Sequence, residues 1–153
     1  MRTFNHLYLI ILKSRIGTLK FSFKECGKGQ HIEKIKWKYQ GHLYGVIDFK
    51  MKCSNETSYR PPTIGNPHGE WNREMNCQEK GFKLLRGREG GWPGIVNVEA
   101  RCVDGNEDLS SNDDLRGQYN RDLTCRVPGS SIVGVQVTKK TNHGIVNFRV
   151  LCG

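Results

Sequence analysis

The sequence predicts an all-β protein built from one supersecondary unit that is used three times. Six cysteines fall into three pairs with nearly equal separations of 27, 25 and 27 residues. Each pair closes with a short segment in which apolar and polar residues alternate, and no 12-residue stretch keeps a helical period. Repetition at a fixed period of about 50 residues is typical of folds that assemble equivalent modules. The cysteines are Cys26, Cys53, Cys77, Cys102, Cys125 and Cys152.

The closing segment of each module is predicted to be a strand. The three segments, 45–53, 94–102 and 144–152, begin with Gly, carry Asp or Asn three residues later and end in Cys. In the first segment Ile47 and Phe49 alternate with polar residues, which predicts one face on a core and one face in water. The repeated polar residue is expected on the water-facing side, where its side chain is a candidate ligand for a sugar hydroxyl or a partner for nearby backbone. These residues are Asp48, Asn97 and Asn147.

The opening segment of each module also repeats. Gly69-Glu70-Trp71 before Cys77 matches Gly117-Gln118-Tyr119 before Cys125, and residues 17–26 keep a weaker version. We expect Trp71 and Tyr119 to serve in packing rather than as a sugar platform. The modules therefore cover about 17–53, 69–102 and 117–152 of a single domain, 17–153. Residues 54–68 and 103–116 are interpreted as surface linkers between them.

The symmetry of the cysteines suggests three disulfides, Cys26–Cys53, Cys77–Cys102 and Cys125–Cys152. Six cysteines allow fifteen pairings, so the assignment depends on the repeat. A zinc site is the alternative, but C-x-x-C and H-x-x-x-H spacings are missing from the sequence. Closing a loop of this size contributes about 3 kcal/mol in the chain-entropy model.

Disulfides imply an oxidising compartment, so we expect a secreted, extracellular protein. Asn55-Glu56-Thr57 is a glycosylation sequon with Asn55 as the acceptor. Residues 1–16 contain a short apolar run and are interpreted as a signal remnant or as an extra strand. No apolar stretch reaches the length of a transmembrane helix, so no transmembrane segment is expected.

Positive charge is concentrated in the first module. The net charge is +9, and residues 1–53 carry 11 Lys and Arg against 3 acidic residues. Lys34, Lys36 and Lys38 alternate with apolar residues, which would place three ammonium groups on one strand face. This face is interpreted either as a site for an acidic polysaccharide or as a solvated surface that keeps the protein soluble. Anionic lipid and nucleic acid are negatively charged like an acidic polysaccharide. We nevertheless expect glycans or other components of an extracellular matrix or coat as partners, and we do not expect nucleic acid.

Trp92 is a further candidate for glycan binding, whereas the sequence predicts no catalytic site. Trp92 lies in a Gly-Gly-Trp-Pro-Gly loop and is the aromatic residue best suited to stack on a sugar ring. G-x-S-x-G, H-E-x-x-H and P-loop motifs are missing, and the cysteines are all assigned to structure, so no catalytic residue, metal site or cofactor is predicted. A glycosidase would need two carboxylates across a cleft. The carboxylates considered for that role are Glu70, Glu74, Asp104, Asp113 and Asp114.

The three repeats together resemble the vitelline membrane outer layer protein 1 family. The resemblance covers roughly residues 17–153 and depends on the two G-x-[WY] openings and on the Asn97…Cys102 and Asn147…Cys152 closures. It implies a β-prism, with three Greek-key sheets around a pseudo-threefold axis, and a secreted protein that binds carbohydrate. The family's acidic segment between the two strands of a module is missing here, so no ligand of that segment is carried over.

The sequence therefore predicts a non-catalytic structural or carbohydrate-binding component of an extracellular coat, matrix or secretion. Two alternatives remain at this point. One is a lectin-like defence or venom protein that binds acidic glycans, and the other is a weak glycan-modifying enzyme.

Overall fold

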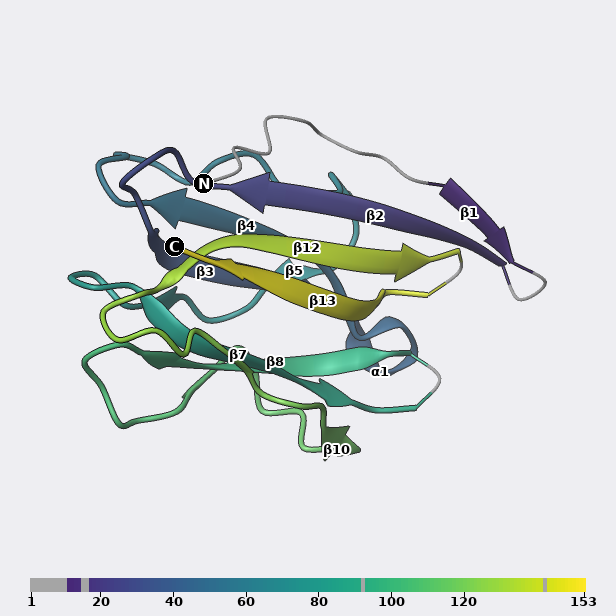
Figure 1. Ribbon diagram of the computed structural model, residues 1–153. Coiled ribbons are helices and arrows are strands. Elements are labelled where there is room, and N and C mark those ends of the chain that lie inside the picture. The colour runs from purple at the N-terminus through teal and green to yellow at the C-terminus, as the bar shows by residue number, and fades with distance from the viewer. Residues whose placement is uncertain (1–10, 15–16, 92, 142) are drawn as a thin grey trace.

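The computed structural model describes residues 11–14, 17–91, 93–141 and 143–153, which form three antiparallel sheets (Figure 1). The first sheet contains β3 (Ile32–Tyr39), β4 (Val46–Cys53), β5 (Glu70–Trp71) and β6 (Met75–Asn76). The second contains β7 (Phe82–Glu89), β8 (Ile95–Cys102), β9 (Leu109–Ser110), β10 (Gln118–Tyr119) and β11 (Leu123–Thr124). The third contains β1 (Ile11–Ser14), β2 (Gly17–Glu25), β12 (Ile132–Lys140) and β13 (Ile145–Cys152). A single helical turn, α1 (Gly41–Tyr44), joins β3 to β4.

Each sheet takes strands from two modules. The long hairpins β3–β4, β7–β8 and β12–β13 are local, but β5 and β6 from module two pair with β3, and β10 and β11 from module three pair with β7. The third hairpin is completed by β2 from module one, which pairs with β12 over seven positions. Each module thus gives strands to the sheet of another module in a closed cycle. The result is the three-module β-prism predicted from the repeat pattern and from its resemblance to a known family.

The core lies between the three sheets and is made by the inward-facing residues of the hairpins. Trp37, Phe49 and Phe148, the last from a different sheet, meet with ring centroids 5.1 Å and 5.5 Å from Trp37. Trp37 and Phe49 are fully buried, as the alternation predicted. Burial of large side chains of this kind contributes about 2 kcal/mol each.

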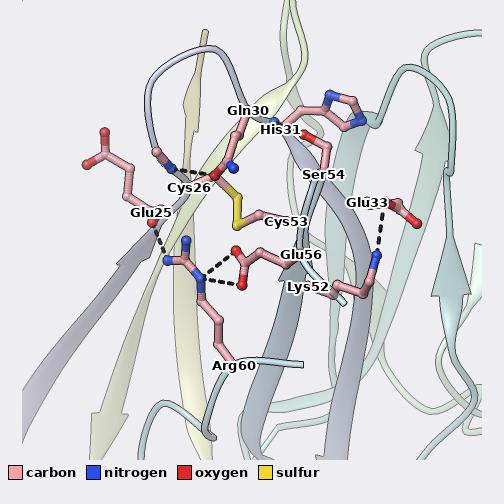
Figure 2. Close-up of a disulfide and its surroundings, with 11 residues drawn as sticks. Glu25, Cys26, Gln30, His31, Glu33, Lys52, Cys53, Ser54, Glu56 and Arg60 are labelled. Atoms are coloured by element: carbon pink, nitrogen blue, oxygen red, sulfur yellow. Dashed lines mark hydrogen bonds and ion pairs between the residues drawn. A yellow bond between two sulfur atoms is a disulfide. The ribbon is translucent and has the colours of Figure 1, made fainter. Parts of the chain in front are cut away.

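All three predicted disulfides form, and each one ties two sheets together. Cys26 follows β2 of the third sheet and is bonded to Cys53 at the end of β4 in the first sheet (Figure 2). By the same scheme the Cys77–Cys102 disulfide joins the first sheet to the second, and Cys125–Cys152 joins the second to the third. The strand exchange and the disulfides therefore connect the sheets in the same cyclic order.

The repeated glycine that opens each closing segment lies where adjacent modules meet. A Cβ on Gly45 would overlap the carbonyl oxygen of Ile95, and one on Gly94 would overlap that of Ile145. A Cβ on Gly144 would overlap the carbonyl oxygen of Val46, which completes the ring of contacts. Only glycine lets the backbones of adjacent modules approach so closely, which explains why all three closing segments begin with glycine.

The two linkers differ from the surface loops expected from the sequence, because both form the outer edge of a sheet. In the first linker the amides of Arg60 and Thr63 donate to carbonyls of β4, with N–O distances of 2.8 Å and 2.9 Å. In the second linker β9 pairs with β8, and Ser111 N donates to Val98 O at 2.9 Å. Ile64 and Leu109 pack against the core from these edges.

Candidate functional site: a basic and aromatic face on the β3–β4 sheet

The outer face of the β3–β4 sheet brings lysines from both strands together. Lys36 on β3 lies opposite Lys50 on β4, and Lys38 lies opposite Trp71 on β5. Tyr59, from the first linker, lies beside them. We refer to Lys36, Lys38, Lys50, Tyr59 and Trp71 as the basic face. The sequence placed Lys34, Lys36 and Lys38 on one strand face. The structure brings Lys36 and Lys38 together with Lys50 and with both aromatic rings.

The two aromatic rings lie under the ammonium groups of the lysines. Lys50 Nζ is 4.3 Å from the centroid of Trp71 and 5.2 Å from that of Tyr59. Lys38 Nζ is 5.3 Å from Trp71, and Lys36 Nζ is 5.5 Å from Tyr59. Cation–π contacts of this kind hold an ammonium group without cancelling its charge. The face is therefore both ordered and positively charged.

The lysines of the first module differ in whether a carboxylate neutralises them. Lys34 pairs with Glu74 at 3.4 Å, and Lys52 pairs with Glu33 at 3.2 Å, the latter visible in Figure 2. Within the described residues, the ion pairs include neither Lys36 nor Lys38 nor Lys50. Lys38 Nζ donates instead to the carbonyl of Asn66 at 2.5 Å.

The pKa of Lys50 is lowered, first by burial and then by the charges of Lys36 and Lys38. Repulsion among three ammonium groups is the physical cause of the second effect. Beside this cluster, Tyr59 donates a hydrogen bond to Glu74 at 2.5 Å, which lowers the pKa of that carboxyl. An anion placed among Lys36, Lys38 and Lys50 would relieve the repulsion.

The corresponding face of the β7–β8 sheet carries equivalent basic and aromatic residues, but with a carboxylate among them. Arg86, Arg88 and Tyr119 occupy the positions of Lys36, Lys38 and Trp71 in the repeat, and both guanidinium carbons lie about 4 Å from the Tyr119 centroid. Glu99 occupies the position of Lys50, and it pairs with Arg86 at 2.7 Å. At the position where the β7–β8 face has the carboxylate of Glu99, the β3–β4 face therefore has the ammonium group of Lys50.

The third face is less charged. Gln136 and Thr138 occupy the positions of Lys36 and Lys38, and Arg149 occupies that of Lys50. Phe21 lies opposite Thr138, where the first face has Trp71. Of the three equivalent faces, only the β3–β4 face combines three basic side chains without a paired carboxylate among the described residues.

The structure corrects the expected exposure of two candidate residues. Asp48 and Asn97 are 0% and 1% exposed, because the linkers cover the strand edges on which they lie. Asp48 accepts hydrogen bonds from the amides of Ile64 and Gly65 at 2.9 Å and 2.8 Å. Asn97 accepts from Ser111 Oγ at 2.8 Å. These side chains hold the linkers in place and do not face solvent.

Two further candidates, Asn147 and Asn55, lie outside the basic face. Asn147 is exposed on β13, and Asn55 is exposed in a turn with φ 68°. Trp92 lies outside the described residues. Trp71 and Tyr119 were expected to pack within the fold, but neither belongs to the buried core, and Tyr119 is 40% exposed.

The carboxylates considered for catalysis are mostly engaged in structural contacts. Asp113 pairs with Arg73, and Asp114 pairs with Arg116 at 2.7 Å. The described ranges contain no cluster of three or more His, Cys, Asp or Glu side chains able to hold a metal ion. Among these residues there is also no helix that is long and apolar enough to span a membrane.

Comparison with known proteins agrees with the fold. No protein-family model and no curated protein matches the chain. Among solved structures the chain is similar to a prostate-specific WGA16 glycoprotein lectin, with a TM-score of 0.70 and 15% sequence identity. The similarity covers 93% of this chain and 94% of the lectin. At this identity the similarity establishes the shared β-prism fold and nothing more specific.

Proposed function

We propose that the protein binds acidic glycans through the basic face of the β3–β4 sheet. The observation that carries the proposal is the difference between equivalent faces. Lys50 occupies the position at which the β7–β8 sheet has Glu99, the carboxylate that pairs with Arg86. Within the described part of the chain, the ammonium groups of Lys36, Lys38 and Lys50 therefore have no paired carboxylate. A sulfated or carboxylated polysaccharide presents repeated anionic groups that match such a cluster.

The aromatic rings suit a saccharide as well as an anion. Trp71 and Tyr59 lie beside the lysines and are partly exposed. The C–H face of a sugar ring packs on aromatic rings, while its charged substituents pair with ammonium groups. Inorganic phosphate would use the lysines but would gain nothing from the aromatic surface. The fold shared with a lectin supports the same choice.

The proposed setting is extracellular. Three disulfides suit an oxidising compartment, and the sequon at Asn55 lies on an exposed turn. We therefore propose a secreted, non-catalytic component of an extracellular coat, matrix or secretion. Membership of the vitelline membrane outer layer family and a role in defence remain predictions that this chain's similarity to known proteins does not decide.

Isothermal titration with a heparin-derived decasaccharide tests the proposal. Wild type is expected to bind saturably, with an affinity that falls as salt rises. The double variant Lys36→Ala/Lys50→Ala is expected to bind about tenfold or more weakly, which corresponds to about 1.4 kcal/mol. Both side chains are only partly buried on the outer face, so their loss should leave the fold intact.

A charge-matched control separates this site from general basicity. Lys80 and Lys83 are exposed lysines on the second module, and Lys80→Ala/Lys83→Ala removes the same charge elsewhere. Its affinity should stay within about twofold of wild type. Equal losses in the two double variants, or binding of neutral dextran as tight as that of heparin, would contradict the proposal.

A further inference from the structure

Among the described residues no segment fills the groove beside β13, whereas the two linkers fill the equivalent grooves beside β4 and β8. Each closing strand has an outer edge that faces the neighbouring sheet. The first linker fills this place beside β4, and the second linker fills it beside β8. Among the described residues, β13 pairs with β12 alone, and its other edge borders a groove of about 490 Å³.

The groove repeats the walls of the filled site beside β8. There, Arg73 follows β5 of the neighbouring sheet. Its backbone amide donates to Ser111 O at 3.1 Å, and its guanidinium pairs with Asp113 of the linker. The residue equivalent to Arg73 is Arg121, which lines the groove beside β13. The backbone hydrogen bonds support this equivalence. Asn72 N donates to Trp37 O on β3 at 2.8 Å, and Asn120 N donates to Gly87 O on β7 at 2.7 Å.

The strand side of the groove is equivalent as well. Val98 O accepts the amide of Ser111 in the second site, and Phe49 O accepts that of Thr63 in the first. The equivalent residue on β13 is Phe148, which lines the groove. Asn147 occupies the position of Asp48 and Asn97, the residues that hold the linkers. Asn147 is exposed, whereas Asp48 and Asn97 are buried. In the hydrogen bonds of the described residues, its side-chain oxygen Oδ1 accepts only from the neighbouring Phe148 amide, at 2.9 Å.

We infer that this groove binds an extended, acidic polypeptide segment of a partner protein, which pairs with β13 as an added antiparallel strand. The peptide character follows from the two linkers, which fill equivalent grooves through backbone hydrogen bonds. The acidic character follows from Arg121 and Arg149, which line the groove with Glu89 and make no ion pair among the described residues. An exposed sheet edge is a ready template for such strand addition.

The site is separate from the basic face, so the two proposals fail independently. The peptide would bond to Phe148 O with one amide, place a carboxylate on Arg121 and lie under the side chain of Asn147. Lys36 and Lys50 belong to another sheet and take no part. Their substitution should therefore leave peptide binding unchanged while it weakens heparin binding.

The test uses a capped synthetic peptide with the sequence of residues 107–115, which is the chain's own second linker. Titrated calorimetrically into the full chain, it should bind saturably at one site. Arg121→Glu should weaken binding at least tenfold, and Asn147→Ala should weaken it several-fold. Lys80→Glu, an equal charge change at an exposed site outside the groove, should change it less than twofold.

Two further peptides separate strand pairing from charge attraction. N-methylation of the serine that corresponds to Ser111 removes the amide that pairs with the strand, and it should abolish binding. A scrambled peptide of the same charge should also fail to bind. Absence of saturable binding by the linker peptide, or binding that survives both N-methylation and Arg121→Glu, would overturn the inference.

Other occupants give different results. If a heparin fragment displaces the peptide and Arg121→Glu weakens the fragment's binding, the groove is a glycan site and the peptide proposal is wrong. If the peptide binds only after residues 1–10 are deleted, the groove holds the chain's own N-terminal segment, and the partner strand is again ruled out.

Discussion

Replacing the carboxylate of Asp48 with an amide should loosen the first linker from the prism. Asp48 is fully buried, and its two oxygens accept four backbone amides. Oδ1 accepts from Phe49 and Ile64, and Oδ2 accepts from Gly65 and Asn66 at 2.8 Å and 3.2 Å. In Asp48→Asn one oxygen becomes an NH2 group, so two backbone amides, at least one of them from the linker, face a donor.

The magnitude follows from the two lost hydrogen bonds. A hydrogen bond to a charged group contributes about 1.5–3 kcal/mol, and the exposed linker recovers part of the loss by binding water. We therefore expect Asp48→Asn to lower the free energy of unfolding by about 3 kcal/mol. For a chain of this size that corresponds to a fall in Tm of roughly 6–12 °C. Differential scanning calorimetry at pH 7 measures it directly.

The reciprocal change in the second module should be equally costly. Asn97 accepts at its oxygen from Ser111, and its NH2 group donates to the carbonyl of Asn112 at 3.0 Å. Asn97→Asp would place a carboxylate oxygen against that carbonyl, so an acceptor would face an acceptor. Asn147→Asp is the matched control, because this side chain is exposed and holds no linker among the described residues. It should change stability by less than about 0.5 kcal/mol.

The reasoning would be refuted if Asp48→Asn and Asn97→Asp were both as stable as wild type. It would equally be refuted if Asn147→Asp lowered Tm as much as the buried substitutions. Either result would mean that the linkers do not depend on the polar residue of the repeat.

Three further predictions concern the prism itself. Cys77→Ser/Cys102→Ser removes a loop closure of 25 residues between two sheets and should cost about 3 kcal/mol in chemical denaturation, whereas an unchanged midpoint would contradict the stapling role. Gly94→Ala should lower the free energy of unfolding by more than about 2 kcal/mol, because its Cβ would meet the backbone of the neighbouring module. Gly91 has a similar positive φ but open space around it, so Gly91→Ala should lower it by about 1 kcal/mol. Equal losses of stability in the two variants would contradict the packing argument. Although burial opposes ionisation, hydrogen bonds from Arg116 and Tyr39 lower the pKa of Asp114 to about 2. Its folded pKa lies below the unfolded one, so its contribution is present above about pH 4 and should be lost as pH falls toward 2, and acid titrations of wild type and Asp114→Asn should converge there. A constant difference between them across that range would contradict this assignment.

The regular parts of the fold were predictable because each rests on a short local pattern. Alternation of apolar and polar residues marks the closing strands, and equal cysteine spacing marks the pairing. The repeated Gly before each closing strand was visible too. Its reason was not, because the contact of Gly45 with Ile95 joins residues of different modules.

The linkers and the polar positions could not be predicted from alternation. By periodicity Asp48 faces water, and only the linker that folds back over β4 buries it. The same limit applies to the candidate site. The lysine strand was visible in the sequence, but the contact of Lys50 with Trp71 requires β5 from the next module to pair with β3. Exchange of strands between modules leaves no local signal.

Backbone amide mapping by NMR with a heparin-derived tetrasaccharide tests the central claim most directly. The account predicts that shift changes concentrate on β3, β4 and β5 around Lys36, Lys50 and Trp71, and that they vanish in Lys36→Ala/Lys50→Ala. Changes concentrated instead on the hairpin turns at the end of the prism that carries α1 (Figure 1), or spread equally over the three sheet faces, would contradict it.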